Sequence, residues 1–194
     1  MRQPLFQVLR LLLKWCSFKS KNMIELKKFD AIDPKILEKE WEYIRNLPAD
    51  ENGFTNDYFG ISWEDFLSVY VPKKIQFSEG KDLPEGFVPQ IDYILWCDGE
   101  IAGMFRVRPV LNDFLRNVTG GHIGYGIVPK FRGKGFASEG LRLALCELKN
   151  LSSDDEAYLF VHKDNKASLK VMQKNGAYIH SETEENFCVR IKLR

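Results

Sequence analysis

The sequence has few of the features that mark several specialised classes of protein. Its four cysteines, Cys16, Cys97, Cys146 and Cys188, are far apart, and none has the close spacing of a zinc site. We therefore expect reduced thiols, a cytoplasmic location and no metal cofactor. The longest apolar stretch is too short to cross a bilayer, which needs ~20 apolar residues, so we predict no transmembrane segment.

The chain also lacks an excess of charge of one sign. Lysine and arginine number 28 against 27 acidic residues, which gives a net charge of +1. A nucleic-acid-binding protein usually carries a clear basic excess, so we expect no nucleic-acid partner. The length of 194 residues, with 44% hydrophobic and 28% charged residues, is typical of one globular domain with a sizeable core.

The N-terminal region needs a separate interpretation. Residues 5–15 are mainly apolar, but two basic residues interrupt them and no signal-peptide cleavage pattern follows. They form either a short amphipathic helix that docks on the domain or a partner, or an extension outside the domain. Because a strand-like stretch begins at Met23, we favour an extension over residues 1–22 and a single domain over residues 23–194.

Hydrophobic periodicity and capping residues predict the element order β-α-α-β-β-β-α-β-α-β-β. The expected strands cover residues 24–29, 91–97, 101–107, 121–128, 157–161, 178–181 and 187–193, and the expected helices cover 34–45, a stretch from 62, 133–150 and 165–175. Residues 72–89, with three prolines, predict a polar connection. This order favours an α/β fold, in which helices cover both faces of a mixed sheet.

A basic, glycine-spaced turn separates a predicted strand from a predicted helix. The segment from Val128 to Ala137 reads VPKFRGKGFA. Gly133 and Gly135 let the backbone approach a ligand closely, and Arg132 and Lys134 add positive charge. A row of backbone N–H groups at the positive end of a helix is a device for holding a pyrophosphate.

Other glycine-loop interpretations fail at single positions. A nucleotide phosphate-binding loop would need Gly at 128 and Ser or Thr at 135, where the chain has Val128 and Gly135. A dinucleotide fingerprint that starts at Gly124 would need Gly at 129, which is Pro129. A plain strand-to-helix turn remains the alternative for this segment alone.

The residue order in this turn resembles the acyl-CoA-binding turn of the GNAT superfamily of N-acetyltransferases, with Lys130 where the family has Arg or Gln. Residues 165–177, NKASLKVMQKNGA, resemble the Asn-initiated helix that flanks the cofactor in that family. The segment GGHIGYGI at 120–127 is similar to that of a bacterial subfamily of predicted acetyltransferases.

The resemblance implies a GNAT-like, mostly antiparallel twisted sheet of about six or seven strands with helices on both faces. It implies direct transfer of an acetyl group from acetyl-CoA, as co-substrate, to a primary amine of an unknown acceptor, in a monomer or homodimer. The implied cofactor-binding residues are Ile127, Val128, Lys130, Phe131, Arg132, Gly133, Lys134, Gly135, Phe136, Ala137, Asn165 and Ser168.

Catalysis of this reaction requires a base for the ammonium and an acid for the leaving thiolate. His122 is the candidate base, because it shares a strand face with two glycines that leave room for a ligand. Many relatives have a tyrosine acid at the position of Met172, so Tyr178 on the next strand, or Tyr125, is the candidate acid here. A structural, hydrogen-bonded histidine is the alternative for His122.

The acceptor side offers further candidates. Glu51 lies in the loop that lines the acceptor side in the family and is a candidate base or amine-binding residue, or else part of a solvated loop. Arg106 and Arg108 are candidates to hold an acidic acceptor, or else cap strand edges. Because Met172 cannot donate a proton, a catalytically decayed acyl-CoA-binding sensor or interaction module is the alternative function.

Overall fold

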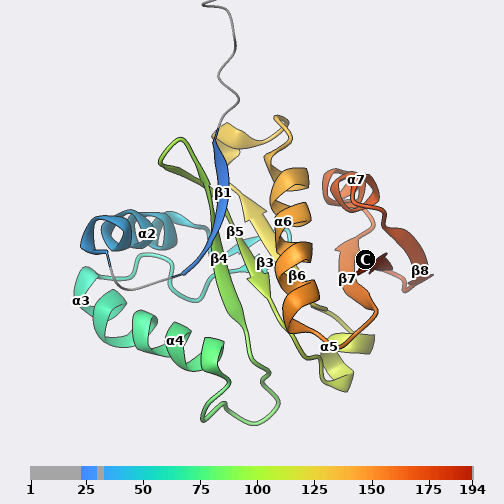
Figure 1. The fold of residues 1–194 in the computed structure, drawn as a ribbon, viewed down its shortest axis with the longest axis horizontal. Helices are drawn as coiled ribbons and strands as arrows, with labels where there is room; N and C mark the ends of the chain where they lie inside the picture. The colour runs from blue at the N-terminus through green and yellow to red at the C-terminus, as the bar shows by residue number, and fades with distance from the viewer. Residues whose placement is uncertain (1–22, 30–32, 194) are drawn as a thin grey trace, which may run out of the picture.

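The structure is a computed structural model that describes residues 23–29 and 33–193. The expected N-terminal extension over residues 1–22 and Cys16 lie outside the described residues. Figure 1 shows strands at the centre of the molecule with helices on both sides. The predicted mixed α/β class is therefore confirmed.

The strands form two larger sheets and one small hairpin. Strands β1 (Ile24–Lys28), β4 (Ile91–Cys97), β5 (Glu100–Val107) and β6 (Ile123–Ile127) form an antiparallel sheet in the order β1-β4-β5-β6. Strands β7 (Glu156–His162), β8 (Tyr178–Glu182) and β9 (Asn186–Lys192) form a second in the order β7-β9-β8. The hairpin consists of β2 (Asp50–Glu51) and β3 (Phe54–Thr55). The antiparallel pairing is as predicted, but the sheet divides between β6 and β7.

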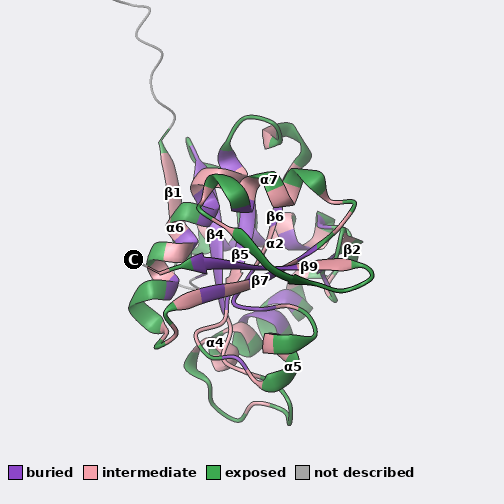
Figure 2. Cartoon of the chain, turned by 90° about the vertical axis from the view of Figure 1, so that its right-hand side faces the viewer, coloured by how far each residue is buried: buried purple, intermediate pink, exposed green. Residues whose placement is uncertain are grey.

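Helices cover the first sheet on both faces, and each face has its own apolar core. On one side lie α2 (Pro34–Asn46), α3 (Trp63–Asp65), the π-helix η1 (Phe66–Tyr70) and α4 (Val71–Glu79). On the other lies α6 (Phe136–Leu151), beside α7 (Lys166–Lys174). The short helix α5 (Asp113–Asn117) follows β5. Figure 2 shows that buried residues dominate β4 and β5, which lie between the two cores.

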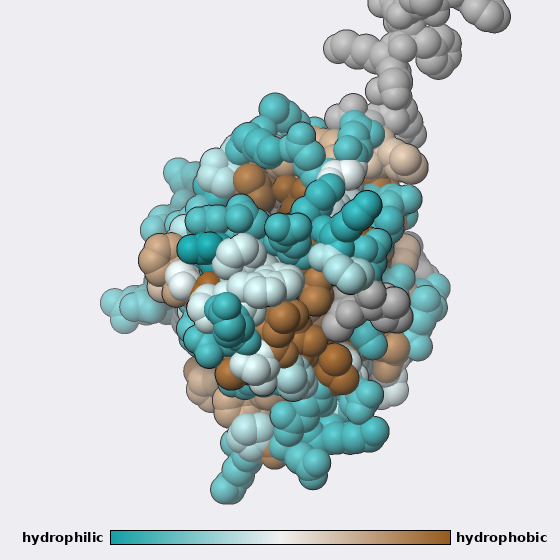
Figure 3. Space-filling model, turned by 90° about the vertical axis from the view of Figure 1, so that its left-hand side faces the viewer, coloured by the Kyte–Doolittle hydropathy of each residue, from teal (hydrophilic) through white to brown (hydrophobic). Residues whose placement is uncertain are grey.

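Helix α4 corrects the expectation of a polar connection from Pro72 onward. Pro72 lacks a backbone N–H and its ring normally clashes with the carbonyl four residues earlier. Here the preceding turn is widened, because the Val71 N–H donates to the Phe66 carbonyl five residues back. That π-type turn accommodates the proline, so the helix continues to Glu79. Figure 3 views this side of the molecule, where hydrophilic side chains surround a smaller apolar group.

Candidate active site

A cavity of about 590 Å³ opens where β6 and β7 diverge. Its walls come from β6, the end of β7, the turn before α6, the helix α7 and the β2–β3 hairpin. These elements are far apart in the sequence, and the division of the sheet brings them together. The residues that line the cavity include Gly133 and Gly135 of the glycine-spaced turn, and also Arg106 and Arg108.

The two sheets are joined at the point where β6 and β7 begin to diverge, and we call this contact the junction. An isolated bridge pairs Gly121 with Leu159, and the His122 N–H donates to the Tyr158 carbonyl at 2.7 Å. Gly121 has φ of 68°, and a Cβ there would lie 2.2 Å from the Tyr158 carbonyl oxygen. Only glycine meets both requirements, so this position fixes how closely the strands approach.

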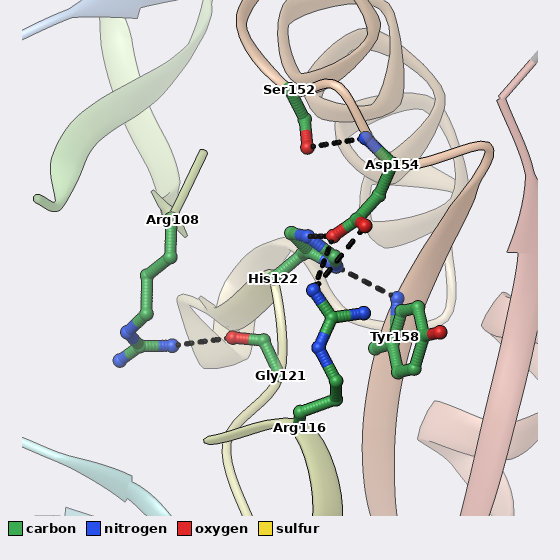
Figure 4. Close-up of polar contacts among 7 residues, drawn as sticks. All are labelled: Arg108, Arg116, Gly121, His122, Ser152, Asp154 and Tyr158. Atoms are coloured by element: carbon green, nitrogen blue, oxygen red, sulfur yellow. Dashed lines mark hydrogen bonds and ion pairs between the residues drawn. The ribbon is translucent and has the colours of Figure 1, made fainter. Parts of the chain in front are cut away.

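His122 is part of this junction and not of the cavity wall. Its side chain is 0% exposed, and its Nδ1 accepts the Tyr158 N–H at 2.9 Å. Its Nε2 lies 3.0 Å from an Asp154 carboxylate oxygen, and Arg116 donates to the same carboxylate at 2.9 Å (Figure 4). Because Nδ1 accepts a hydrogen bond, the neutral ring carries its proton on Nε2, facing Asp154.

The electrostatics of His122 also disfavour a role as base. Burial lowers its pKa to about 4, against the opposing effect of Asp154. The lone pair that would take up a proton is already used by the Tyr158 N–H. The expectation that His122 faces a ligand beside Gly124 and Gly126 is wrong, because β6 begins only at Ile123 and the left-handed Gly121 turns the chain before it.

The glycine-spaced turn presents its backbone to the cavity. A single 3-10 turn, η2 (Pro129–Phe131), leads into Gly133 and Gly135, whose φ values are 72° and 91°. Helix α6 then begins at Phe136, and no side chain caps its first turn. Its first N–H groups are consequently available to an anion at the positive end of a 16-residue helix.

The twelve expected cofactor-binding residues divide into two groups. Eight line the cavity: Ile127, Phe131, Arg132, Gly133, Gly135, Ala137, Asn165 and Ser168. Four do not: Val128, Lys130, Lys134 and Phe136. Phe136 is buried in the core, Lys130 forms an ion pair with Glu100, and Lys134 donates to the Lys130 carbonyl at 2.7 Å. Main-chain groups of the turn, and not its lysines, thus face the cavity.

Arg132 joins the turn to the small hairpin. Its Nε donates to the Ile127 carbonyl at 2.8 Å, and its Nη2 pairs with Glu51 at 2.5 Å. Glu51 does line the cavity, as expected for the loop between the first two helices. Its carboxylate is nevertheless occupied by Arg132, so it is not a free base in this arrangement.

Helix α7 forms the wall opposite the turn. Asn165 caps it by accepting the Ser168 N–H at 3.0 Å, and the Ser168 hydroxyl lies 2.7 Å from the Tyr125 hydroxyl. Near the other end, Asn175 donates to the Ser138 carbonyl at 3.1 Å, which ties α7 to the first turn of α6. The two motifs seen in the sequence therefore face one cavity at a fixed separation.

The two candidate acids occupy different environments. Tyr178 lies on β8, is 43% exposed, donates to Glu156 and does not line the cavity, so it lacks the inward orientation that a role as the acid would require. Tyr125 does line the cavity, and burial raises its pKa to about 12, which keeps its hydroxyl protonated. Met172 is buried in the core and also lines the cavity.

The acceptor end combines cationic and aromatic side chains. Arg106 and Arg108 line it, with Phe54 of the hairpin and His162 at the end of β7. A Cβ on Gly53 would lie 3.4 Å from His162 Nε2, so the histidine stands against the hairpin. The sequence analysis missed His162, although it directly follows the predicted strand that ends at Val161.

Comparison with known proteins agrees with this geometry. A family model described as an acetyltransferase (GNAT) domain matches residues 75–178, which is more than half of the chain. The match spans β4 to the start of β8 and so includes both motifs. The chain belongs to the GNAT acetyltransferase family. It is an N-acetyltransferase by class.

Solved structures share the fold at low sequence identity. A GNAT-family acetyltransferase from Streptococcus pneumoniae has a TM-score of 0.55 at 15% identity, covering 87% of this chain and 97% of that one. Spermidine N-acetyltransferase from Vibrio cholerae, solved with CoA and spermine, has a TM-score of 0.57 at 15% identity, covering 88% and 95%. The N-acetyltransferase PseH from Campylobacter jejuni, solved with acetyl coenzyme A, has a TM-score of 0.51 at 19% identity, covering 88% and 99%.

No curated protein matches the sequence significantly. Within residues 23–29 and 33–193, none of the helices has the length and apolar character needed to cross a membrane. In the same residues, no three His, Cys, Asp or Glu side chains gather in a way that could hold a metal ion.

Proposed function

We propose that this protein binds acetyl-CoA along the cavity between the turn and α7, and transfers the acetyl group directly to an amine at the acceptor end. The observation that carries this proposal is the uncapped start of α6, behind Gly133 and Gly135, facing the same cavity as the Asn-capped helix α7. In this arrangement the pyrophosphate accepts hydrogen bonds from the turn, and the acyl arm lies between β6 and α7.

The reaction needs three groups around the thioester. In the proposed reaction the main-chain N–H of Ile127 in β6 donates to the carbonyl oxygen as charge develops on it. Val128 is not part of this proposal, because its N–H already donates to the Ala102 carbonyl at 2.9 Å. The Tyr125 hydroxyl, protonated and beside Ser168, is our candidate to give the departing thiolate a proton. Tyr125 would thereby supply the function that Met172 cannot.

The acceptor amine must lose a proton before it attacks, because an ammonium has no lone pair. His162 is the histidine that lines the cavity within the described residues, and it replaces His122 as our candidate base. An imidazole at the cavity wall can accept the proton directly or through a water. The roles of Tyr125 and His162 are separate parts of the proposal and are tested separately below.

The cofactor part of the proposal is tested by two glycine variants. Gly135→Ala forces a side chain into a left-handed position at the turn, and Gly86→Ala does the same at φ of 81° in a loop outside the cavity. Both variants should lose a similar ~1 kcal/mol of stability. Only Gly135→Ala should raise the Kd of acetyl-CoA in calorimetry. Equal affinities for acetyl-CoA in the two variants would place the cofactor elsewhere.

The alternative of a decayed binding module is distinguished by turnover. Thiol release from acetyl-CoA, followed with a thiol reagent across a panel of primary amines, measures transfer without knowledge of the acceptor. Release that depends on an amine supports the enzyme. Tight binding of acetyl-CoA with no release for any amine would favour the module, whose motivating feature is Met172.

A further inference from the structure

Two arginines lie side by side at the acceptor end of the cavity. Arg106 lies on β5 and Arg108 directly follows the last residue of that strand, so at a spacing of two residues along an extended chain their side chains leave the same face of the sheet. Arg106 is paired across the ladder with Gly124, which has no side chain, and the Arg108 N–H donates to the His122 carbonyl at 2.8 Å. Both side chains line the cavity on the side of the β2–β3 hairpin.

Neither guanidinium has a carboxylate partner among residues 23–29 and 33–193. Arg106 lies over the Phe54 ring, 4.3 Å from its centroid, and its Nε is buried without a hydrogen bond in that part of the chain. Arg108 makes one side-chain hydrogen bond there, from Nη1 to the Gly121 carbonyl at 3.2 Å. Burial, and then the nearby charge of Arg106, lower the pKa of Arg108 to about 10.

The acidic residue across the ladder from Arg106 is already paired. Asp92 is the cross-strand partner of Arg106, but its carboxylate takes Lys74 at 2.8 Å and Gln90 at 3.0 Å. Arg132, which also lines the cavity, differs from these two arginines because it forms an ion pair with Glu51. Within the described residues, Arg106 and Arg108 are therefore positive charges without an ion-pair partner of their own at the point where an acceptor would lie, although Asp92 attracts both from a distance.

The cavity has little to attract a cationic acceptor. Glu51 is the one acidic side chain that lines it within the described part of the chain, and Arg132 occupies its carboxylate. A polyamine would bring further positive charge against two guanidinium groups that have no ion-pair partner in the described residues. An amine that also carries an anion would instead supply the missing partner, since the planar guanidinium suits a carboxylate held through two parallel hydrogen bonds.

We propose that the acceptor is a small amine that carries a carboxylate, such as an amino acid or a short peptide, and that Arg106 and Arg108 hold this carboxylate. The inference rests on the proposed function, because it names the acceptor class for the same cavity. Arg106 lies over Phe54 and so is fixed in direction, and Arg108 adds a second positive charge beside it.

Matched pairs of acceptors test this proposal through kcat/KM for thiol release. Each pair contains an amino acid or dipeptide and its C-terminal amide, and spermidine and 2-aminoethylphosphonate complete the panel. The carboxylate members should be preferred by about tenfold or more, because a hydrogen bond to a charged group is lost in the amide. Equal values within the pairs, or preference for spermidine or the phosphonate, would overturn the proposal.

Arginine variants connect the preference to the residues. Arg106→Gln and Arg108→Gln should raise KM for the carboxylate members about 10- to 100-fold and leave KM for the amides nearly unchanged. Arg106→Lys should recover part of the preference, because it keeps the charge. Arg142→Gln, an exposed arginine of α6 that pairs with Glu139, is the matched control and should change neither. An equal loss for both members of a pair would contradict the assignment.

A binding measurement separates this inference from the proposed reaction. N-acetylated amino acids and their amides resemble the products and need no turnover, so calorimetry on the CoA-loaded protein reports the carboxylate contact directly. Weaker binding of the acid to Arg106→Gln, with an unchanged Kd of CoA, supports the inference even if no amine is acetylated. Equal binding of acid and amide by the unaltered protein would refute it while leaving transfer to another acceptor intact.

Discussion

His122 at the junction of the two sheets gives the sharpest test of the structural assignment. The perturbation is His122→Asn, studied across pH. An asparagine oxygen can still accept the Tyr158 N–H, which His122 Nδ1 accepts at 2.9 Å, but asparagine does not titrate. The substitution should therefore keep the hydrogen bond that joins the two sheets and remove the pH dependence that His122 gives to the free energy of unfolding.

The magnitude follows from the pKa of His122 in the two states. Burial lowers the folded pKa to about 4; Asp154 opposes this shift, and Arg116 and Arg190 add to it. In the unfolded chain histidine titrates near ~6.5, so the unfolded state binds the proton more readily between these values. The contribution of His122 to the free energy of unfolding is then fully present above pH ~6.5. Below that pH it falls by ~1.4 kcal/mol per pH unit, which amounts to about 3 kcal/mol by pH 4.

Urea unfolding followed by tryptophan fluorescence at several pH values measures this difference. The unaltered protein should lose about 3 kcal/mol more than His122→Asn between pH 7 and pH 4. Asp92 also makes the free energy of unfolding of the protein fall as pH falls. Burial raises the pKa of Asp92, but Lys74 and Arg106 outweigh burial and lower it. That contribution is common to both proteins and cancels, and His180→Asn, an exposed histidine, is the matched control.

Equal slopes of stability against pH in the two proteins would refute the buried, neutral state of His122. The pH profile of kcat/KM gives an independent check. If His122 were the base, His122→Asn would lose the acidic limb of that profile. The structure instead predicts that this limb persists in the variant.

The remaining predictions concern the cavity itself. Tyr125→Phe should lower kcat about 100-fold or more with little change in the Kd of acetyl-CoA, because the variant lacks the general acid. Tyr178→Phe, at an exposed position, should leave kcat unchanged. Equal rates for the two variants in the thiol-release assay would remove Tyr125 from the mechanism. His162→Gln should lower kcat in the thiol-release assay, because it removes the proposed base, and His180→Gln, on an exposed histidine, should not. An unchanged kcat in His162→Gln would point to water as the proton acceptor.

The parts of the site that the sequence predicted depend on local rules. The turn at Gly133 and Gly135 needs left-handed residues before a helix, and Asn165 caps the next helix through its own side chain. Each of these signals involves residues within a few positions of one another. They also lie inside the family match, so both local structure and family membership were accessible from the residues alone.

The parts that the sequence did not predict depend on packing between distant elements. The alternation of side chains along a strand predicts that His122 faces the ligand. The left-handed Gly121 and the hydrogen bond from Tyr158 instead direct the His122 side chain into the junction between the two sheets. His162 gains its position only because β7 diverges from β6 and meets the hairpin. The pairing of Glu51 with Arg132 joins residues from different elements, which no local pattern reports.

The junction at Gly121 also has a mechanical consequence. Strand β6 is paired with β5 along its length, and it contacts the second sheet through the bridge at Gly121. Ile127, at the other end of β6, is six residues from that bridge, roughly 20 Å at the usual rise of a strand. If the bridge acts as a pivot between the two sheets, each degree of rotation moves Ile127 by roughly 0.3 Å relative to the second sheet. Since a misplacement of about 1 Å can cost 100-fold in rate, a substitution that tilts the pivot by a few degrees would slow acetyl transfer without touching either substrate.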